Sequence, residues 1–110
     1  MHDNIKGGAL TETTFLTLLA VFEPRHGYAI MQFVSAQTGG RVQIGAGTLY
    51  GAINTMEKKK WIAMCGNGDN SRTKEYLVTD IGRQVALDEA ARMAGIMKLS
   101  KSIMKGGEGK

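Results

Sequence analysis

The sequence predicts a mainly α-helical domain that carries one small β-hairpin and ends in a long helix. Within the first half of the chain, apolar residues recur at helical spacing in three separate segments. Two short runs with strand character then flank a loop made of turn-forming residues. A last apolar stripe continues at helical spacing almost to the C-terminus. At 110 residues the chain has the size of a single folded domain.

The first predicted helix follows a polar N-terminal arm, residues 1–9, which we expect to be flexible. Thr11 is a suitable N-cap because its hydroxyl accepts a hydrogen bond from a backbone N–H of the first turn. Apolar residues then fall at i, i+3, i+4 and i+7, on one helix face: Phe15, Leu18, Leu19 and Phe22. The helix should end before Pro24, since the residue preceding a proline disfavours the helical conformation.

Two further helices are predicted before the hairpin. The second covers about residues 27–37, and Gly39-Gly40 ends it, because glycine adopts the left-handed conformation at little cost. A short extended connection, Val42–Ile44, leads to a third helix that opens at Gly45–Thr48. Its inner face is apolar: Leu49, Ala52, Ile53 and Met56. Lys58–Lys60 stand at its C-terminal end, where positive charge complements the helix dipole.

A β-hairpin is predicted after the third helix. Trp61–Cys65 and Lys74–Val78 have strand character, and they flank a loop of turn formers, residues 66–71. Three compact helices followed by a two-stranded hairpin are the layout of a winged helix-turn-helix domain, which we place at residues 10–79.

A long last helix completes the predicted fold. Thr79 caps it, the helix covers residues 80–105, and residues 106–110 are expected to be a flexible tail. One of its faces is apolar: Ile81, Val85, Ile96, Leu99 and Ile103, widened by Ala86, Met93, Met97 and Met104. The stripe is longer than the domain core needs, and an exposed apolar stripe usually marks a partner. A second copy of the chain is the simplest partner, through these residues: Val85, Met93, Ile96, Met97, Leu99 and Ile103. In the alternative, the helix folds back wholly onto its own domain.

Composition limits the class of protein. The net charge of +4 and the isoelectric point of about 9.4 favour a polyanionic partner. A single cysteine, Cys65, leaves no internal disulfide and no cysteine-rich metal site, which fits a reducing compartment. The N-terminus lacks a signal-peptide pattern, and no apolar stretch is long enough to cross a bilayer. We therefore expect a cytoplasmic protein that does not associate with membranes.

The third helix is the candidate DNA-reading element. Its outer face carries small or hydrogen-bonding residues: Gly47, Tyr50, Gly51, Asn54 and Lys58. Thr48 is placed to bond a phosphate oxygen, and Asn54 to pair with an adenine in the major groove. No Asp or Glu occurs between Pro24 and Met56, as a surface that approaches DNA requires. In the alternative, Thr48 caps the helix, Tyr50 packs at a domain edge and Asn54 is only solvated.

The hairpin adds positive charge beside this helix. Arg72 and Lys74 flank its tip and are placed to reach a minor groove or its phosphates, with Lys58–Lys60 nearby. The alternative is a solvated cationic surface. A two-fold dimer would present two such surfaces to a pseudo-palindromic site on double-stranded DNA, with recognition helices about 34–36 Å apart.

Nothing in the sequence supports catalysis or a bound cofactor or metal. The segment Gly45–Gly47 lacks the last glycine of the dinucleotide-binding fingerprint, because Tyr50 stands at that position. His26, at the start of the second helix, is more typical of a capping or packing residue than of a ligand or base. We expect a regulator rather than an enzyme. The alternative function is a winged-helix module that binds another protein without specific DNA binding.

Four pieces of sequence in a fixed order match a known pattern. They are Leu16–Leu19, then Glu23–Tyr28, which contains His-Gly-Tyr, then Gly47–Ile53, which contains Gly-Thr-Leu-Tyr, and then Lys74–Gly82. Together they resemble the PadR family of bacterial winged-helix transcriptional regulators, and the likeness covers about residues 10–92. The resemblance implies a homodimeric DNA-binding protein, usually a repressor, whose last helix forms the dimer. It also implies release of the DNA by a small, often aromatic, effector.

The resemblance carries further expectations for individual residues. The helix that starts near Gly47 should enter the major groove, with Thr48 and Tyr50 near the DNA. Lys60 stands where the family usually ends this helix with glycine, so a strained or differently closed turn is expected there. The last helix ends by about Lys105, as in the short subclass without a separate C-terminal domain, and it contains no aromatic residue on which an effector could stack.

Overall fold

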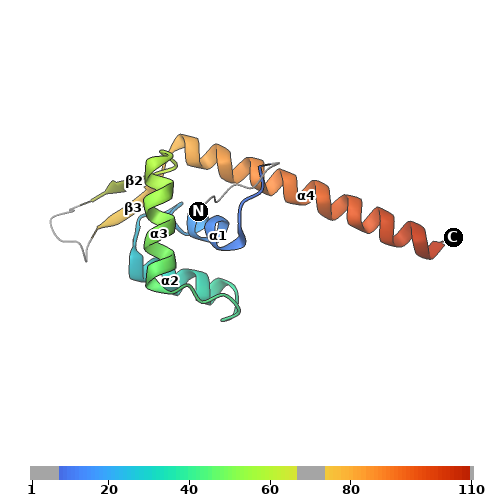
Figure 1. Cartoon of the computed structure of the whole chain (residues 1–110), viewed down its shortest axis with the longest axis horizontal. Helices are drawn as coiled ribbons and strands as arrows, with labels where there is room; N and C mark the ends of the chain where they lie inside the picture. The colour runs from blue at the N-terminus through green and yellow to red at the C-terminus, as the bar shows by residue number, and fades with distance from the viewer. Residues whose placement is uncertain (1–7, 67–73, 110) are drawn as a thin grey trace.

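The computed structural model describes residues 8–66 and 74–109, and its helices and hairpin follow the predicted order (Figure 1). The elements are α1 (Glu12–Ala20), β1 (Arg25–His26), α2 (Gly27–Gln37), α3 (Ala46–Lys58), β2 (Ile62–Cys65), β3 (Glu75–Val78) and α4 (Asp80–Gly109). The predicted fold class, a winged helix-turn-helix with a long C-terminal helix, is confirmed. Most of the predicted N-terminal arm and the hairpin tip with Arg72 lie outside the described residues.

Side-chain caps begin three of the helices. The Thr11 hydroxyl accepts a hydrogen bond from the Thr14 N–H at 3.2 Å, and Thr79 does the same for Gly82 at 3.1 Å. At the start of α2, the Nδ1 atom of His26 accepts from the Ala29 N–H at 3.2 Å. Each cap provides an acceptor for a backbone donor that has no partner within the helix. The caps expected from the sequence at Thr11 and Thr79 are confirmed.

α2 and α3 end in the same backbone motif, with different residues. After α2, Gly39 has φ +59° and Gly40 donates to the Ser35 carbonyl oxygen at 2.7 Å. After α3, Lys60 has φ +66° and the Trp61 N–H donates to the Met56 carbonyl oxygen at 2.9 Å. This left-handed closure normally uses glycine, because a Cβ crowds the following carbonyl. The strained turn expected at Lys60 is therefore present.

The hairpin belongs to a three-stranded antiparallel sheet with the order β1-β3-β2. β2 pairs with β3 from Ile62↔Val78 to Cys65↔Glu75, as the two predicted strands require. The predicted hairpin is therefore present, and a third strand that was not predicted extends it: β1 pairs with the other edge of β3 through Arg25↔Tyr76. A strand of two residues is too short to show a sequence period, and it forms only because β3 offers an open edge.

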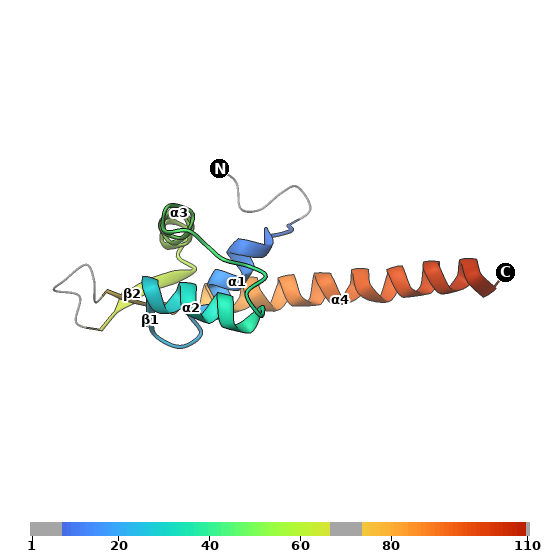
Figure 2. The same cartoon turned by 90° about the horizontal axis from the view of Figure 1, so that it is seen from below.

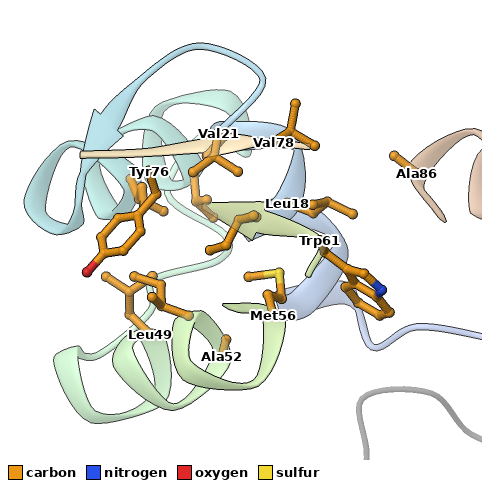
Figure 3. Packing of buried hydrophobic residues seen from close by; sticks show 14 of the residues in the cluster. Leu18, Val21, Leu49, Ala52, Met56, Trp61, Tyr76, Val78 and Ala86 are labelled. Carbon is orange, nitrogen blue, oxygen red and sulfur yellow. The ribbon is translucent and has the colours of Figure 1, made fainter. Parts of the chain in front are cut away.

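The core lies between the short helices and the sheet. Figure 3 shows Leu18 of α1, Leu49 and Met56 of α3, and Val78 of β3 converging there, and all four are buried. All four residues predicted for the inner face of α3 are buried. These contacts fix the orientation of α3, so its opposite face is turned to solvent.

α4 begins against this core and then leaves it (Figure 2). A Cβ at Gly82 would stand 2.9 Å from the Trp61 carbonyl carbon, so the first turn of α4 packs directly on that backbone. Ala86 and Glu89 are buried, whereas nearly all side chains from Met93 to Lys105 are exposed. The helix continues to Gly109, beyond the predicted end at residue 105, since glycine weakens a helix without forbidding helical φ and ψ.

Candidate nucleic-acid interface

The outer face of α3 presents small and uncharged residues together with one lysine. Gly47, Gly51, Asn54 and Lys58 follow one another along this face and are all exposed. The two glycines carry no side chain that would keep a ligand away from the helix backbone. This face bears no carboxylate, so it does not repel a polyanion. Its dimensions suit the major groove, which admits an α-helix.

One border of this face opens into a cleft between α1 and α3. The cleft has a volume of about 580 Å³ and is lined by Thr11, Thr13, Thr14, Gly47, Thr48, Gly51, Ala52 and Thr55. Thr48 is exposed here, and it does not cap α3, because the N-cap is Gly45 and makes no side-chain hydrogen bond. The alternative reading of Thr48 as a cap was wrong. The threonines of α1 were missed by sequence reasoning, although the run Thr11–Thr14 was a visible signal.

The other border of the face is formed by Tyr50. Its side chain is 47% exposed and lies over Gly27 at the start of α2. Close to it, Tyr76 of β3 is buried, and burial raises the pKa of its phenol, with smaller contributions from Glu57 and Tyr50. Tyr50 therefore stands at a domain edge and also remains accessible beside the reading face.

Charged groups near the cleft are arranged as a pair. Arg41, in the connection between α2 and α3, makes a two-pronged hydrogen-bonded ion pair with Glu12 at the start of α1. The hydrogen bond from Arg41 lowers the pKa of the Glu12 carboxyl, and both side chains are exposed. The pair partly neutralises the carboxylate of Glu12, which stands in the chain between two residues of the cleft lining, Thr11 and Thr13. Residues 29 positions apart gave no local sequence signal for this contact.

The predicted wing residues are placed only in part. Lys74 precedes β3 and is half-buried, and Arg72 lies outside the described residues. Lys58, Lys59 and Lys60 are exposed at the end of α3, and the Lys59 Nζ atom lies 5.1 Å from the centre of the Trp61 ring. Positive charge thus continues from α3 toward the hairpin.

The long helix carries a second surface. Beyond the core, its apolar side chains are 39–63% exposed: Met93, Ile96, Met97, Leu99, Ile103 and Met104. Val85, which the sequence assigned to a dimer interface, instead packs partly against the core of its own domain. Helical geometry puts Lys98 and Lys105 on the side opposite this apolar stripe, and Lys101 at its border.

The described part of the chain offers no sign of metal chemistry or of a membrane span. Within residues 8–66 and 74–106, His, Cys, Asp and Glu side chains do not gather in a group that could hold a metal ion. Over the same residues, no helix combines the length and hydropathy needed to cross a bilayer.

Comparison with known proteins agrees with this geometry. The sequence-family model for the transcriptional regulator PadR-like family matches residues 15–88. A PadR family transcriptional regulator from Eggerthella lenta has a similar structure. It is 27% identical with a TM-score of 0.67, and the alignment covers 84% of this chain and 77% of that chain.

Two further solved structures share the fold. A PadR family transcription regulator from Clostridium difficile is 22% identical with a TM-score of 0.65, over 83% of this chain and 97% of that chain. A transcriptional regulator from Clostridium thermocellum is 21% identical with a TM-score of 0.63, over 86% of this chain and 90% of that chain. Among curated protein sequences, none matches this chain.

Proposed function

The chain belongs to the PadR-like family of transcriptional regulators, and from this premise we propose that it is a homodimeric repressor that binds a pseudo-palindromic DNA site through α3. The family consists of regulators and not of enzymes, so the expectation of a non-catalytic protein is confirmed. In the proposed function the protein acts in the cytoplasm, on double-stranded DNA, without a cofactor.

The outer face of α3 is the observation that carries the proposal. Gly47 and Gly51 allow the helix backbone to approach the floor of the groove, and Asn54 then reaches a base edge. An Asn side chain that donates to N7 and accepts from N6 of adenine discriminates against the other bases. Thr48 at the cleft, with Tyr50 at the opposite border, contacts the sugar–phosphate backbone on either side and sets the register.

Lysines supply the sequence-independent part of the binding free energy. Lys58 at the end of α3, with Lys74 and Arg72 of the wing, neutralises phosphates and releases their counterions. This contribution to the affinity falls as the salt concentration rises. The hydrogen bonds of Asn54 to a base displace no counterions, so their contribution depends much less on salt.

The exposed stripe of α4 supports the dimer. Its apolar side chains from Met93 to Met104 lie on the continuation of the face that packs on the core at Ala86. A two-fold arrangement of α4 helices buries this stripe on both copies and carries two α3 helices to successive major grooves. A dimer bound to DNA in this way represses transcription by occupying the promoter. Release by a small, often aromatic, effector is the part of the proposal that rests on family membership alone.

The proposal is tested by titrating a fluorescent duplex, selected from a random pool on the protein, at rising salt. We expect the logarithm of the association constant to fall linearly with the logarithm of the salt concentration. Lys58→Ala or Lys74→Ala should make this fall less steep, reducing the magnitude of the slope by about one, and should leave the sequence preference unchanged. Asn54→Ala should weaken the preference for a particular base at one position of the site. Lys101→Ala, a lysine of α4 far from α3, is the matched control and should leave both quantities unchanged.

Two outcomes would count against the proposal. No binding of any duplex even at low salt would favour the protein-interaction module instead. An unchanged base preference in Asn54→Ala would remove Asn54 from the reading face while leaving DNA binding itself intact.

A further inference from the structure

The contact between Tyr50 and Gly27 joins α3 to the start of α2. A Cβ built on Gly27 would stand 2.7 Å from Cζ and 3.3 Å from Cε1 of Tyr50, and closer still to the hydroxyl oxygen. Non-bonded carbon atoms pack at about 3.5–4.0 Å, so the Tyr50 ring can occupy this place only because residue 27 has no side chain. Gly27 is buried under the ring, and Tyr50 is 47% exposed.

The backbone at Gly27 does not itself require glycine. Gly27 does not have a positive φ, and it is the first residue of a regular helix. Alanine is the better helix former by roughly 1 kcal/mol in a helix interior, so helix stability alone would favour it. The feature that glycine provides here is space for the Tyr50 ring.

The position of this ring matters for the neighbouring residue of the reading face. Tyr50 and Asn54 are four residues apart on α3, so their side chains leave the helix on the same side. The Tyr50 ring lies against Gly27 at the start of α2, and its phenol interacts electrostatically with that of Tyr76 on β3. A ring displaced by a Cβ would swing outward, over the side chain of Asn54 and the groove-facing surface of α3.

We infer that Gly27 is a positioning residue for DNA binding, which holds the Tyr50 ring at the border of the α3 face and leaves Asn54 free to reach a base. The inference rests on the proposed function of α3. It assigns to a residue of α2, outside the recognition helix, control over how that helix reads DNA.

The variant Gly27→Ala tests this role. We expect affinity for the selected duplex to fall about tenfold, the size of one lost hydrogen bond to a base or phosphate. The melting temperature should stay the same or rise, because the displaced atoms are the far end of an exposed side chain. Gly95→Ala, another glycine in a helix with open space around it, is the control and should leave the affinity unchanged.

A double-mutant cycle separates positioning from other effects. In the background Tyr50→Ala the ring is gone, so adding Gly27→Ala should change the affinity by less than twofold. An equal loss in both backgrounds would mean that Gly27 acts independently of Tyr50, and a wild-type affinity in Gly27→Ala would mean that the ring position is irrelevant. Either result overturns the inference.

Two controls keep the outcome decisive. If Gly27→Ala does not fold, the double variant Gly27→Ala/Tyr50→Ala, which lacks the ring that the new Cβ would meet, must fold and bind within twofold of Tyr50→Ala, and a larger loss overturns the inference. If the wild-type chain binds no duplex at all, the proposed function fails. If the wild-type chain binds and Gly27→Ala binds equally well, only the inference about Gly27 fails.

Discussion

Lys60 adopts a left-handed conformation with φ +66°, and it is the one non-glycine residue in the described part of the chain with positive φ. Its N–H donates to the Glu57 carbonyl oxygen at 3.0 Å, which closes α3. The next N–H, that of Trp61, bonds to Met56 and directs the chain into β2. The turn therefore sets the angle between the recognition helix and the wing, and the lysine holds it at a steric cost of about 1–2 kcal/mol.

Replacing Lys60 with glycine should stabilise the protein. We expect Lys60→Gly to raise the free energy of unfolding by about 1 kcal/mol, because glycine adopts this conformation without a Cβ clash. Urea denaturation followed by circular dichroism measures the change. Lys60→Ala removes the same charge but keeps a Cβ, so it should show no gain. An equal gain in both variants would assign the effect to charge and not to the backbone.

At the scale of elements, the connection between α4 and the N-terminal segment depends on one buried carboxylate. Glu89 is 3% exposed, and it accepts hydrogen bonds from Arg92 at 2.9 and 2.6 Å. The Arg92 hydrogen bonds, together with one from the Leu10 backbone, lower the pKa of Glu89 against the opposing effect of burial. Glu89 lies where α4 leaves the domain, so its hydrogen bond from Leu10 links the segment before α1 to the first part of α4.

This carboxylate predicts an acid-dependent loss of stability. Because the folded-state pKa of Glu89 is lowered, its contribution is present above the ordinary carboxyl pKa of 4.5 and is lost as the pH falls through the folded-state value. Glu89→Gln should therefore be less stable than the wild type at pH 7, by about 1–2 kcal/mol. The difference should shrink as the pH falls below about 4.

Urea denaturation of both proteins across this pH range measures the effect. Asp88→Asn is the matched control, since Asp88 is exposed on the neighbouring position and bonds only to Gln84 among the contacts described. A stability difference for Glu89→Gln that is the same at pH 7 and at pH 3 would contradict the assigned role.

At the scale of the whole molecule, α4 makes the chain elongated. The principal extents are 63 × 28 × 24 Å. The radius of gyration is 16.1 Å, against about 13 Å for a compact domain of this length. The excess comes from the half of α4 that projects beyond the core with its apolar stripe in solvent (Figure 2). A single copy therefore leaves this stripe uncovered, and a second copy would cover it.

A charge placed in this stripe should separate the proposed dimer. We expect Ile103→Asp to shift the mass in light scattering from about twice 11.9 kDa to 11.9 kDa, since a buried unpaired carboxylate opposes association. Ile103 is 63% exposed in one copy, so the fold of the domain should be unaffected. Lys98→Asp changes the opposite side of the same helix and should remain dimeric. A wild-type chain that is monomeric at micromolar concentration would refute the dimer.

Much of the fold was predictable from the sequence, because its signals are local. The caps at Thr11 and Thr79, the Gly39-Gly40 end of α2 and the apolar face of α3 each depend on residues within one or two helical turns. The outer face of α3 follows from the inner one by helical periodicity, which is why the sequence predicts that Asn54 is exposed on it.

The remaining features depend on contacts between distant segments. β1 pairs with an edge of β3 about fifty residues later, Arg41 reaches Glu12 across 29 positions, and Tyr50 lies on Gly27 from a different helix. Such contacts leave no period in the sequence, because they depend on where the core places whole elements. The sequence by itself thus determined which helix faces outward, with which side chains. Only the tertiary structure decided what borders that face, because packing against α1, α2 and β3 selects the side-chain directions there.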